Sequence, residues 1–88
     1  MAFDLDFSEQ AQKDVEIHKK AGNKALLKKI LVLFNELTEH PFEGTGKPEP
    51  LKHQLTGYWS RRINQEHRII YKVTENIVHI ASVYGHYL

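Results

Sequence analysis

The chain contains no cysteine, and this absence excludes disulfide bonds and thiolate metal sites. It also lacks an apolar run of about 18 residues, the length that a membrane-spanning helix requires. The first residues, MAFDLDFSEQ, carry acids where a secretory signal peptide carries bases. We therefore expect a soluble, cytoplasmic protein that does not bind a membrane and that forms one domain over residues 1–88.

The composition of the chain is that of a globular protein, but charged residues are distributed unevenly between its two halves. Hydrophobic residues make up 41% and charged residues 26%, which is enough for one modest core. Residues 1–44 hold six lysines against eight acids, whereas residues 45–88 hold six lysines and arginines against three acids. The basic second half could attract a polyanion such as RNA, although an ordinary solvated surface has the same composition.

The first half of the chain is predicted to form a strand and two helices. Alternation of apolar residues with aspartate in FDLDF predicts a half-buried strand over residues 3–7. Ser8 is a suitable N-cap for a helix over residues 8–21, which stops at the Gly22-Asn23 pair. Apolar residues that recur at spacings of three and four predict a second helix: Leu26, Leu27, Ile30, Leu31, Phe34 and Leu37. This helix should end at Pro41, because the residue before a proline is disfavoured in a helix.

The second half changes to a period of two. Segments 57–63, 67–73 and 76–84 are rich in β-branched and aromatic residues and predict an antiparallel meander, with the first strand joining its edge. The fold class is therefore α+β, with a two-helix hairpin covering one face of a single twisted sheet and burying Ile69, Tyr71 and Val73. Arg68 and Lys72 alternate with these buried residues along the strand, so the sheet face away from the helices should be open and basic.

Several familiar motifs fail on inspection. GTGK at residues 44–47 has the wrong glycine spacing for a phosphate-binding loop, no Ser or Thr follows Lys47, and Pro48 prevents a helix from starting there. The six histidines show no H-x-x-x-H pairing, so we expect no metal site. No serine sits in a nucleophile elbow.

Three residues remain as candidates for chemistry. Glu49 lies between two prolines that hold its backbone extended. Arg68 projects from the predicted middle strand, and His86 follows the last strand. Each also has an ordinary interpretation, as a solvated loop acid, a surface arginine and a frayed terminal residue.

A resemblance changes the balance between these interpretations. The run PFEGTGKPEPLKHQLTGYWSRRINQEHRIIYKV at residues 41–73, with GHY at 85–87, closely resembles the YoeB/Txe family of bacterial toxin endoribonucleases in the RelE-like superfamily. The resemblance implies cleavage of mRNA on the ribosome. It implies Glu49 as general base, Arg68 as the residue that stabilises the phosphate and His86 as general acid, with Lys52, Arg62 and Tyr87 as supporting substrate contacts.

The same resemblance implies partners and a metal-independent reaction without cofactors, in which the RNA 2′-hydroxyl attacks. Expected partners are mRNA on the ribosome and an antitoxin of the YefM/Axe type, with operator DNA bound only through the antitoxin. The chain should form a homodimer or a hetero-oligomer with that antitoxin. Two alternatives stay open, a ribosome-binding translation inhibitor without catalysis and a gyrase-inhibiting toxin of the same superfamily.

Overall fold

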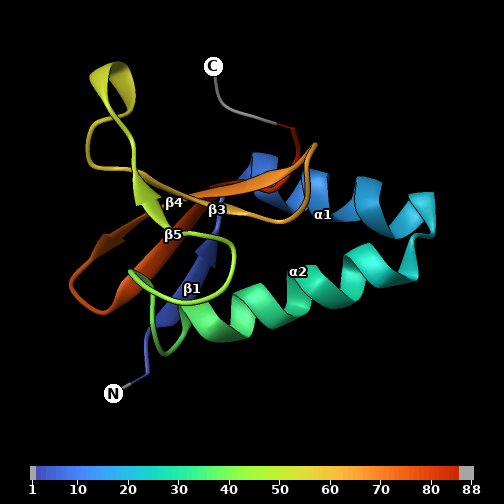
Figure 1. Ribbon diagram of the computed structural model, residues 1–88, viewed down its shortest axis with the longest axis horizontal. Coiled ribbons are helices and arrows are strands. Elements are labelled where there is room, and N and C mark those ends of the chain that lie inside the picture. Colours follow the sequence, from blue (N-terminus) through green and yellow to red (C-terminus); the bar gives the residue numbers. More distant parts are fainter. Residues whose placement is uncertain (1, 86–88) are drawn as a thin grey trace.

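The computed structural model describes residues 2–85, which form two helices and a five-stranded sheet (Figure 1). The helices are α1 (Glu9–Ala21) and α2 (Lys24–Leu37), and one short 3-10 turn, η1, spans His53–Leu55. The strands are β1 (Asp4–Phe7), β2 (Glu49–Pro50), β3 (Trp59–Arg62), β4 (Arg68–Thr74) and β5 (Ile77–Ser82).

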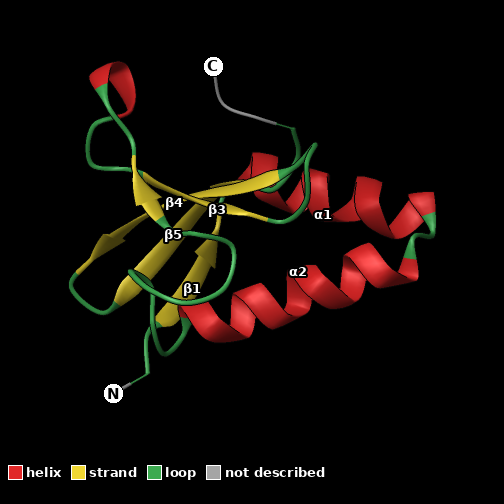
Figure 2. Ribbon diagram, viewed as in Figure 1, coloured by secondary structure: helices red, strands yellow, loops and turns green. Residues whose placement is uncertain are grey.

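The sheet has the strand order β1-β5-β4-β3-β2. All neighbouring strands are antiparallel except β1, which pairs with β5 in the parallel direction from Asp4 opposite Ile77 to Phe7 opposite Ile80. The predicted α+β fold, with the meander and the N-terminal strand at its edge, is therefore confirmed (Figure 2). The two-residue strand β2 was not predicted, because only its pairing with β3 distinguishes it from an extended loop.

The helix boundaries follow from local capping. The Ser8 hydroxyl oxygen accepts a hydrogen bond from the Ala11 N–H at 3.0 Å, as predicted for an N-cap. Gly22 ends α1 in the left-handed conformation, and the side chain of Asn23 then caps α2 through the Leu26 N–H.

The predicted end of the second helix at Pro41 is wrong, because α2 ends at Leu37. The N–H groups of Thr38 and Glu39 bond to carbonyls three residues back, at Asn35 and Glu36, so the last turn tightens before the proline is reached. The proline therefore stands in the loop that follows the helix.

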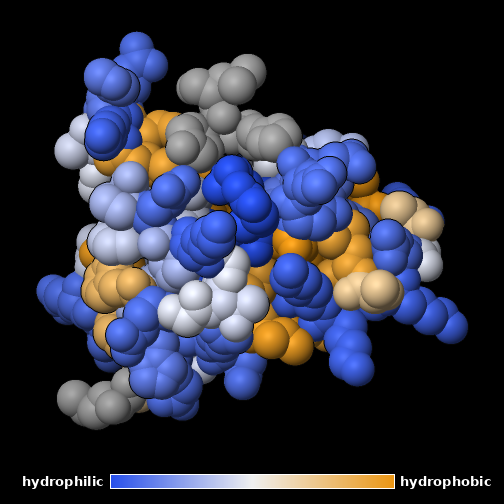
Figure 3. All heavy atoms as spheres, in the orientation of Figure 1, coloured by the Kyte–Doolittle hydropathy of each residue, from blue (hydrophilic) through white to orange (hydrophobic). Residues whose placement is uncertain are grey.

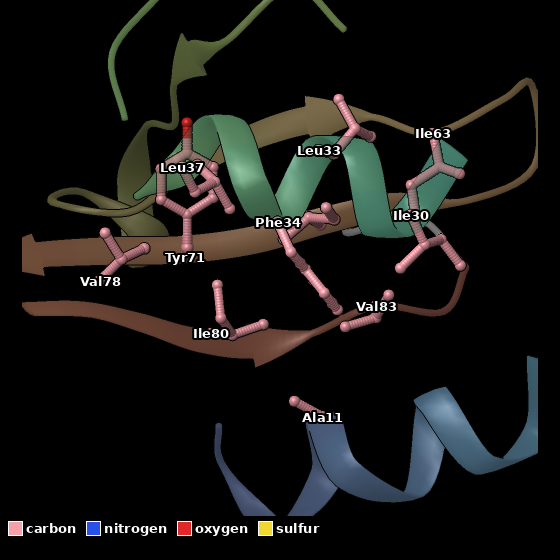
Figure 4. Packing of buried hydrophobic residues seen from close by; sticks show 11 residues of the cluster. Ala11, Ile30, Leu33, Phe34, Leu37, Ile63, Tyr71, Val78, Ile80 and Val83 are labelled. Atoms are coloured by element: carbon pink, nitrogen blue, oxygen red, sulfur yellow. The ribbon is translucent and has the colours of Figure 1, made fainter. Parts of the chain in front are cut away.

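The core lies between the two helices and one face of the sheet (Figure 4). Ile69 and Tyr71 of β4 are fully buried there, as predicted, whereas Val73 is half-buried. Their neighbours in the cluster come from α1, α2, β5 and the adjoining loops: Ala11, Ile30, Leu33, Phe34, Leu37, Ile63, Val78, Ile80 and Val83.

Some apolar side chains stay exposed on the helices, and Figure 3 shows hydrophobic surface over this part of the molecule. They include Ile17 of α1 and Leu31 and Val32 of α2. Within residues 2–85, neither helix combines the length and apolar character needed to span a bilayer.

The core predicts a contrast between two leucines of α2. Leu33 is 0% exposed and Leu31 is 65% exposed. Leu33→Ala should lower the free energy of unfolding by about 2–5 kcal/mol because it removes buried groups and leaves a cavity. Leu31→Ala makes the same change in helix propensity on the surface and should cost no more than about 0.5 kcal/mol. Urea unfolding measures both, and equal losses would contradict this packing.

Candidate functional site

The loop that carries Glu49 is fastened to the sheet by the buried guanidinium of Arg61. Arg61 lies on β3 and its side chain is 0% exposed. One terminal nitrogen donates to the backbone carbonyls of His40 at 2.7 Å and Glu43 at 2.9 Å, and the other donates to the Glu36 carboxylate at 3.2 Å. A single side chain thus joins α2, the loop after it and the sheet.

Tyr71 reinforces this attachment from the next strand. Its hydroxyl donates to the carbonyl of Pro41 at 2.6 Å in a buried position. Burial raises the pKa of the Tyr71 phenol, although the nearby Arg61 acts in the opposite direction, so the hydroxyl keeps the proton that it donates.

Two glycines let the loop pass close to Arg61. The carbonyl of Gly46 accepts the Arg62 N–H at 2.7 Å, and a Cβ added to Gly46 would lie 2.5 Å from the Arg62 carbonyl oxygen. A Cβ on Gly44 would lie 2.5 Å from the Glu36 carboxylate. Both glycines also have positive φ. The glycines of the GTG sequence therefore allow the backbone to approach its neighbours closely, and they do not form a phosphate-binding loop.

The loop delivers Glu49 to the sheet face opposite the helices. Glu49 pairs with Ser60 at the edge of the sheet, and its backbone is extended, as the flanking prolines predict. A carboxylate oxygen of Glu49 lies 3.7 Å from a guanidinium nitrogen of Arg68 on β4. Because the Glu49 side chain is 54% exposed and that of Arg68 19%, the pair is open to a ligand.

Two further predicted residues lie beside this pair. Arg62 is exposed and pairs with Arg68 across β3 and β4, which places both on the same face. Lys52 is exposed and lines a hollow of about 410 Å³ that Glu49 also lines. The structure therefore places Arg62 next to the Glu49–Arg68 pair and Lys52 on a hollow that it shares with Glu49.

His86 and Tyr87 lie outside the described residues, but the segment before them is fastened at four points. The Asp14 carboxylate accepts the Val83 N–H, and His18 Nε2 donates to the Val83 carbonyl, both at 2.9 Å. His67 Nδ1 accepts the Gly85 N–H at 2.9 Å. The Arg68 N–H donates to the Gly85 carbonyl at 2.9 Å. The residue before His86 is thus bonded directly to the backbone of Arg68.

The comparisons with known proteins place the chain in a family. A family model described as the YoeB-like toxin of bacterial type II toxin-antitoxin systems matches residues 7–87. The chain belongs to this family. As a YoeB-family chain, it is the toxin of a type II toxin-antitoxin system.

Individual relatives match along almost the whole chain. The toxin YoeB of Escherichia coli K12 is 46% identical over 83 residues, which cover 94% of this chain and 98% of the relative. The structure of a YoeB dimer from Staphylococcus aureus superposes with a TM-score of 0.85 at 43% identity, covering 99% of this chain and 100% of that one. A YoeB–YefM complex from the same organism gives 0.84 at 44% identity, with the same coverage of both chains.

Sequence reasoning missed Arg61 and the polar groups that hold residues 83–85. The period of two could have identified Arg61, because it shares the phase of Trp59 and Ile63, on the side of the sheet that faces the core. No comparable signal marks Asp14, His18 or His67, which are buried by contacts distant in the sequence. Within residues 2–85, no three His, Asp or Glu side chains group as metal ligands.

The Arg61 attachment predicts a pH-dependent contribution from Glu36. Hydrogen bonding from Thr45 lowers the pKa of Glu36 from 4.5, with a smaller contribution from Arg61. A carboxyl whose pKa is lowered by folding contributes stability above its unfolded pKa and loses it as the pH falls through the folded pKa. Glu36→Gln should therefore cost about 1–3 kcal/mol at pH 7, because it leaves a buried guanidinium with a weaker partner.

Urea unfolding as a function of pH tests this prediction. The difference in stability between the wild type and Glu36→Gln should shrink as the pH falls below 4.5. Glu39→Gln, an exposed change in the adjacent turn, is the control and should leave stability nearly unchanged. A difference that stays constant down to acid pH would show that the charge of Glu36 does not contribute.

Proposed function

We propose that this toxin is a ribosome-dependent mRNA endoribonuclease that inhibits translation by cleaving mRNA. The observation that carries the proposal is the Glu49–Arg68 pair on one sheet face, which is partly open to solvent, with the Arg68 N–H bonded to the residue before His86. A base and a cation that can hold phosphate thereby lie side by side, and the residue before the candidate proton donor is bonded to the backbone of that cation.

The chemistry uses the nucleophile that RNA carries. Glu49 accepts the proton of the 2′-hydroxyl, the 2′-oxygen forms a bond to phosphorus, and the bond from phosphorus to the 5′-oxygen breaks. His86 donates a proton to the departing 5′-oxygen, so the products are a 2′,3′-cyclic phosphate and a 5′-hydroxyl. Because the nucleophile belongs to the substrate, the scheme assigns no step to a metal or another cofactor.

Arg68 stabilises the charge that develops on the phosphate. Its guanidinium offers a fork of N–H donors that matches phosphate oxygens. In the free protein this fork lies beside the Glu49 carboxylate, 3.7 Å away, so a bound phosphate would take over one partner of an existing pair. Lys52, Arg62 and Tyr87 are assigned supporting contacts to the RNA, and the positions of Lys52 and Arg62 next to the pair support this assignment.

Single substitutions of the three catalytic candidates test the assignment. Glu49→Gln, Arg68→Gln and His86→Gln should each abolish growth inhibition and lower the rate of mRNA cleavage on ribosomes by about 10²–10⁴-fold. Glu49→Gln should leave the free energy of unfolding within about 0.5 kcal/mol of the wild type, because its side chain is on the surface. Glu75→Gln, an exposed change in the turn between β4 and β5, is the control.

Toxicity that survives all three changes would remove the catalytic assignment. Loss of cleavage with full growth inhibition would favour a ribosome-binding inhibitor without catalysis. Gyrase inhibition by the wild type, with intact mRNA, would favour the other toxin class.

The partner assignment rests on the same face. A YefM-type antitoxin, the partner in the solved S. aureus complex, would neutralise the toxin by placing an acidic or amphipathic segment over Arg62 and Arg68. The chain would form a homodimer, as in the S. aureus dimer structure, or a hetero-oligomer with the antitoxin. Operator DNA would be bound through the antitoxin alone.

Dependence on the ribosome follows from the small size of the chain and from the weak electrostatic attraction that its low net charge exerts on RNA. A net charge of +1 over 88 residues gives little attraction for free RNA. Six lysines of α1 and α2 are exposed on the helical side, away from the candidate site, and are suited to ribosomal RNA phosphates: Lys13, Lys19, Lys20, Lys24, Lys28 and Lys29. The ribosome would then supply both local concentration and a bent mRNA geometry.

Single-turnover cleavage of one mRNA with and without purified ribosomes, at matched salt, measures this dependence. We expect ribosomes to raise the rate at least about a hundredfold, which corresponds to about 3 kcal/mol of barrier. Equal rates on free and ribosome-bound mRNA would contradict the ribosome-dependent mechanism while leaving the ribonuclease assignment intact.

A further inference from the structure

A second polar site lies on the same sheet face as the Glu49–Arg68 pair. A pocket of about 190 Å³, called here the Lys72 pocket, is lined by Asp6, Ser8, Tyr58, Lys72, His79, Ile80 and Ala81. Lys72 stands four residues from Arg68 on β4, so the two side chains share a face and are separated by about 13 Å along the strand. Of the residues assigned to catalysis or its supporting contacts, the four within residues 2–85 do not line this pocket.

His79 is held in a fixed orientation at the base of the Lys72 pocket. Its Nδ1 donates to a carboxylate oxygen of Asp6, and the two atoms are 3.2 Å apart. Its Nε2 lies 2.6 Å from the Thr74 hydroxyl. Within the part of the chain that the structure describes, the second carboxylate oxygen of Asp6 accepts no hydrogen bond. The pocket therefore offers one positioned acceptor.

Lys72 and Tyr58 supply a cation and an aromatic surface beside that acceptor. The Lys72 ammonium lies 5.4 Å from the centroid of the Tyr58 ring. Among residues 2–85, it forms no ion pair with a carboxylate. Lys72 pairs with His79, and His79 pairs with Asp6, across three adjacent strands. The backbones of Lys72 and Asp6 are thus about two interstrand spacings apart, or roughly 10 Å.

We propose that the Lys72 pocket binds one nucleotide of the mRNA that flanks the scissile phosphate, with a preference for a base that carries an exocyclic amine. The proposal rests on the ribonuclease function proposed above. Lys72 contacts the phosphate, Tyr58 stacks against the base, and Asp6 accepts a hydrogen bond from the amine. Adenine, cytosine and guanine carry such an amine, whereas uracil does not.

The experiment titrates the full chain with two uncleavable 2′-O-methyl trinucleotides, one of uridine only and one with adenosine at both ends. Backbone amide shifts at Arg68 report the catalytic face, and those at Lys72 and His79 report the pocket. We expect both sets to shift, with about tenfold tighter binding of the adenosine-ended probe. Asp6→Asn should remove most of this preference, because an amide donates to a uracil carbonyl as readily as it accepts from an amine.

Substitutions at two residues of the pocket separate a direct contact with the RNA from a purely structural role. Lys72→Met should weaken binding of both probes and lower the slope of log Kd against log salt by about 0.7, the value for one lost phosphate contact on a single strand. Lys72→Arg keeps the charge and should restore the slope. Tyr58→Leu should raise the Kd about tenfold through lost stacking, and Tyr58→Phe should not.

The outcomes distinguish this proposal from the ribonuclease assignment. Shifts at Arg68 without shifts at Lys72 and His79 would overturn the Lys72 pocket and leave the nuclease standing. An unchanged salt slope in Lys72→Met would do the same. Absence of shifts at either place also overturns the pocket, and cleavage on ribosomes then decides the nuclease assignment separately.

Discussion

The geometry of the candidate site depends on one buried guanidinium. Arg61 has no exposed surface, and its two terminal nitrogens bond to two backbone carbonyls and one carboxylate, while its Nε has no partner among the described residues. A buried charge with so many partners fixes everything that it touches, because losing any partner leaves part of the charge uncompensated. The loop after α2 follows a course that keeps these bonds, and Gly44 and Gly46 allow the backbone to come that close. The position of Glu49 is therefore a consequence of a residue on the other face of the sheet.

A second set of buried side chains holds residues 83–85, on the other side of Arg68 from Glu49. Asp14, His18 and His67 bond to the backbone at Val83 and Gly85, and the rings of His18 and His67 pack edge to face with centroids 4.8 Å apart. Both sets of contacts converge on β4, because Arg68 contacts Glu49 through its side chain and Gly85 through its backbone. Two independent attachments therefore hold the chain around Arg68, one at the loop that carries Glu49 and one at residues 83–85.

Local patterns in the sequence predicted most of the fold, and long-range contacts account for what they missed. Ser8, Gly22 and the alternation in residues 67–73 act within a few residues, so the helix start, the helix end and the central strand were predictable. The strand β2 and the early end of α2 depend on partners elsewhere in the chain or on a tightened last turn, which no short window shows. Arg61 and Arg62 are adjacent and chemically identical, and only their place in the pleat makes one structural and leaves the other on the face of the site. The polar groups at residues 83–85 were not predictable because buried Asp and His are indistinguishable in sequence from solvated ones.

The parallel pairing of β1 with β5 sets the order in which the toxin can become complete. The first strand made during synthesis finds its partner only when residues 77–80 exist, and Asp14 and His18 find theirs only at Val83. Contacts between residues this far apart in the chain form late, because the intervening chain must be closed into a loop first. A partly folded chain in which β5 has not yet paired with β1 lacks both the edge of the sheet and the attachment at Val83. The topology thus couples the first strand and the first helix to the last strand, so that the candidate site is complete only when both ends of the fold have met.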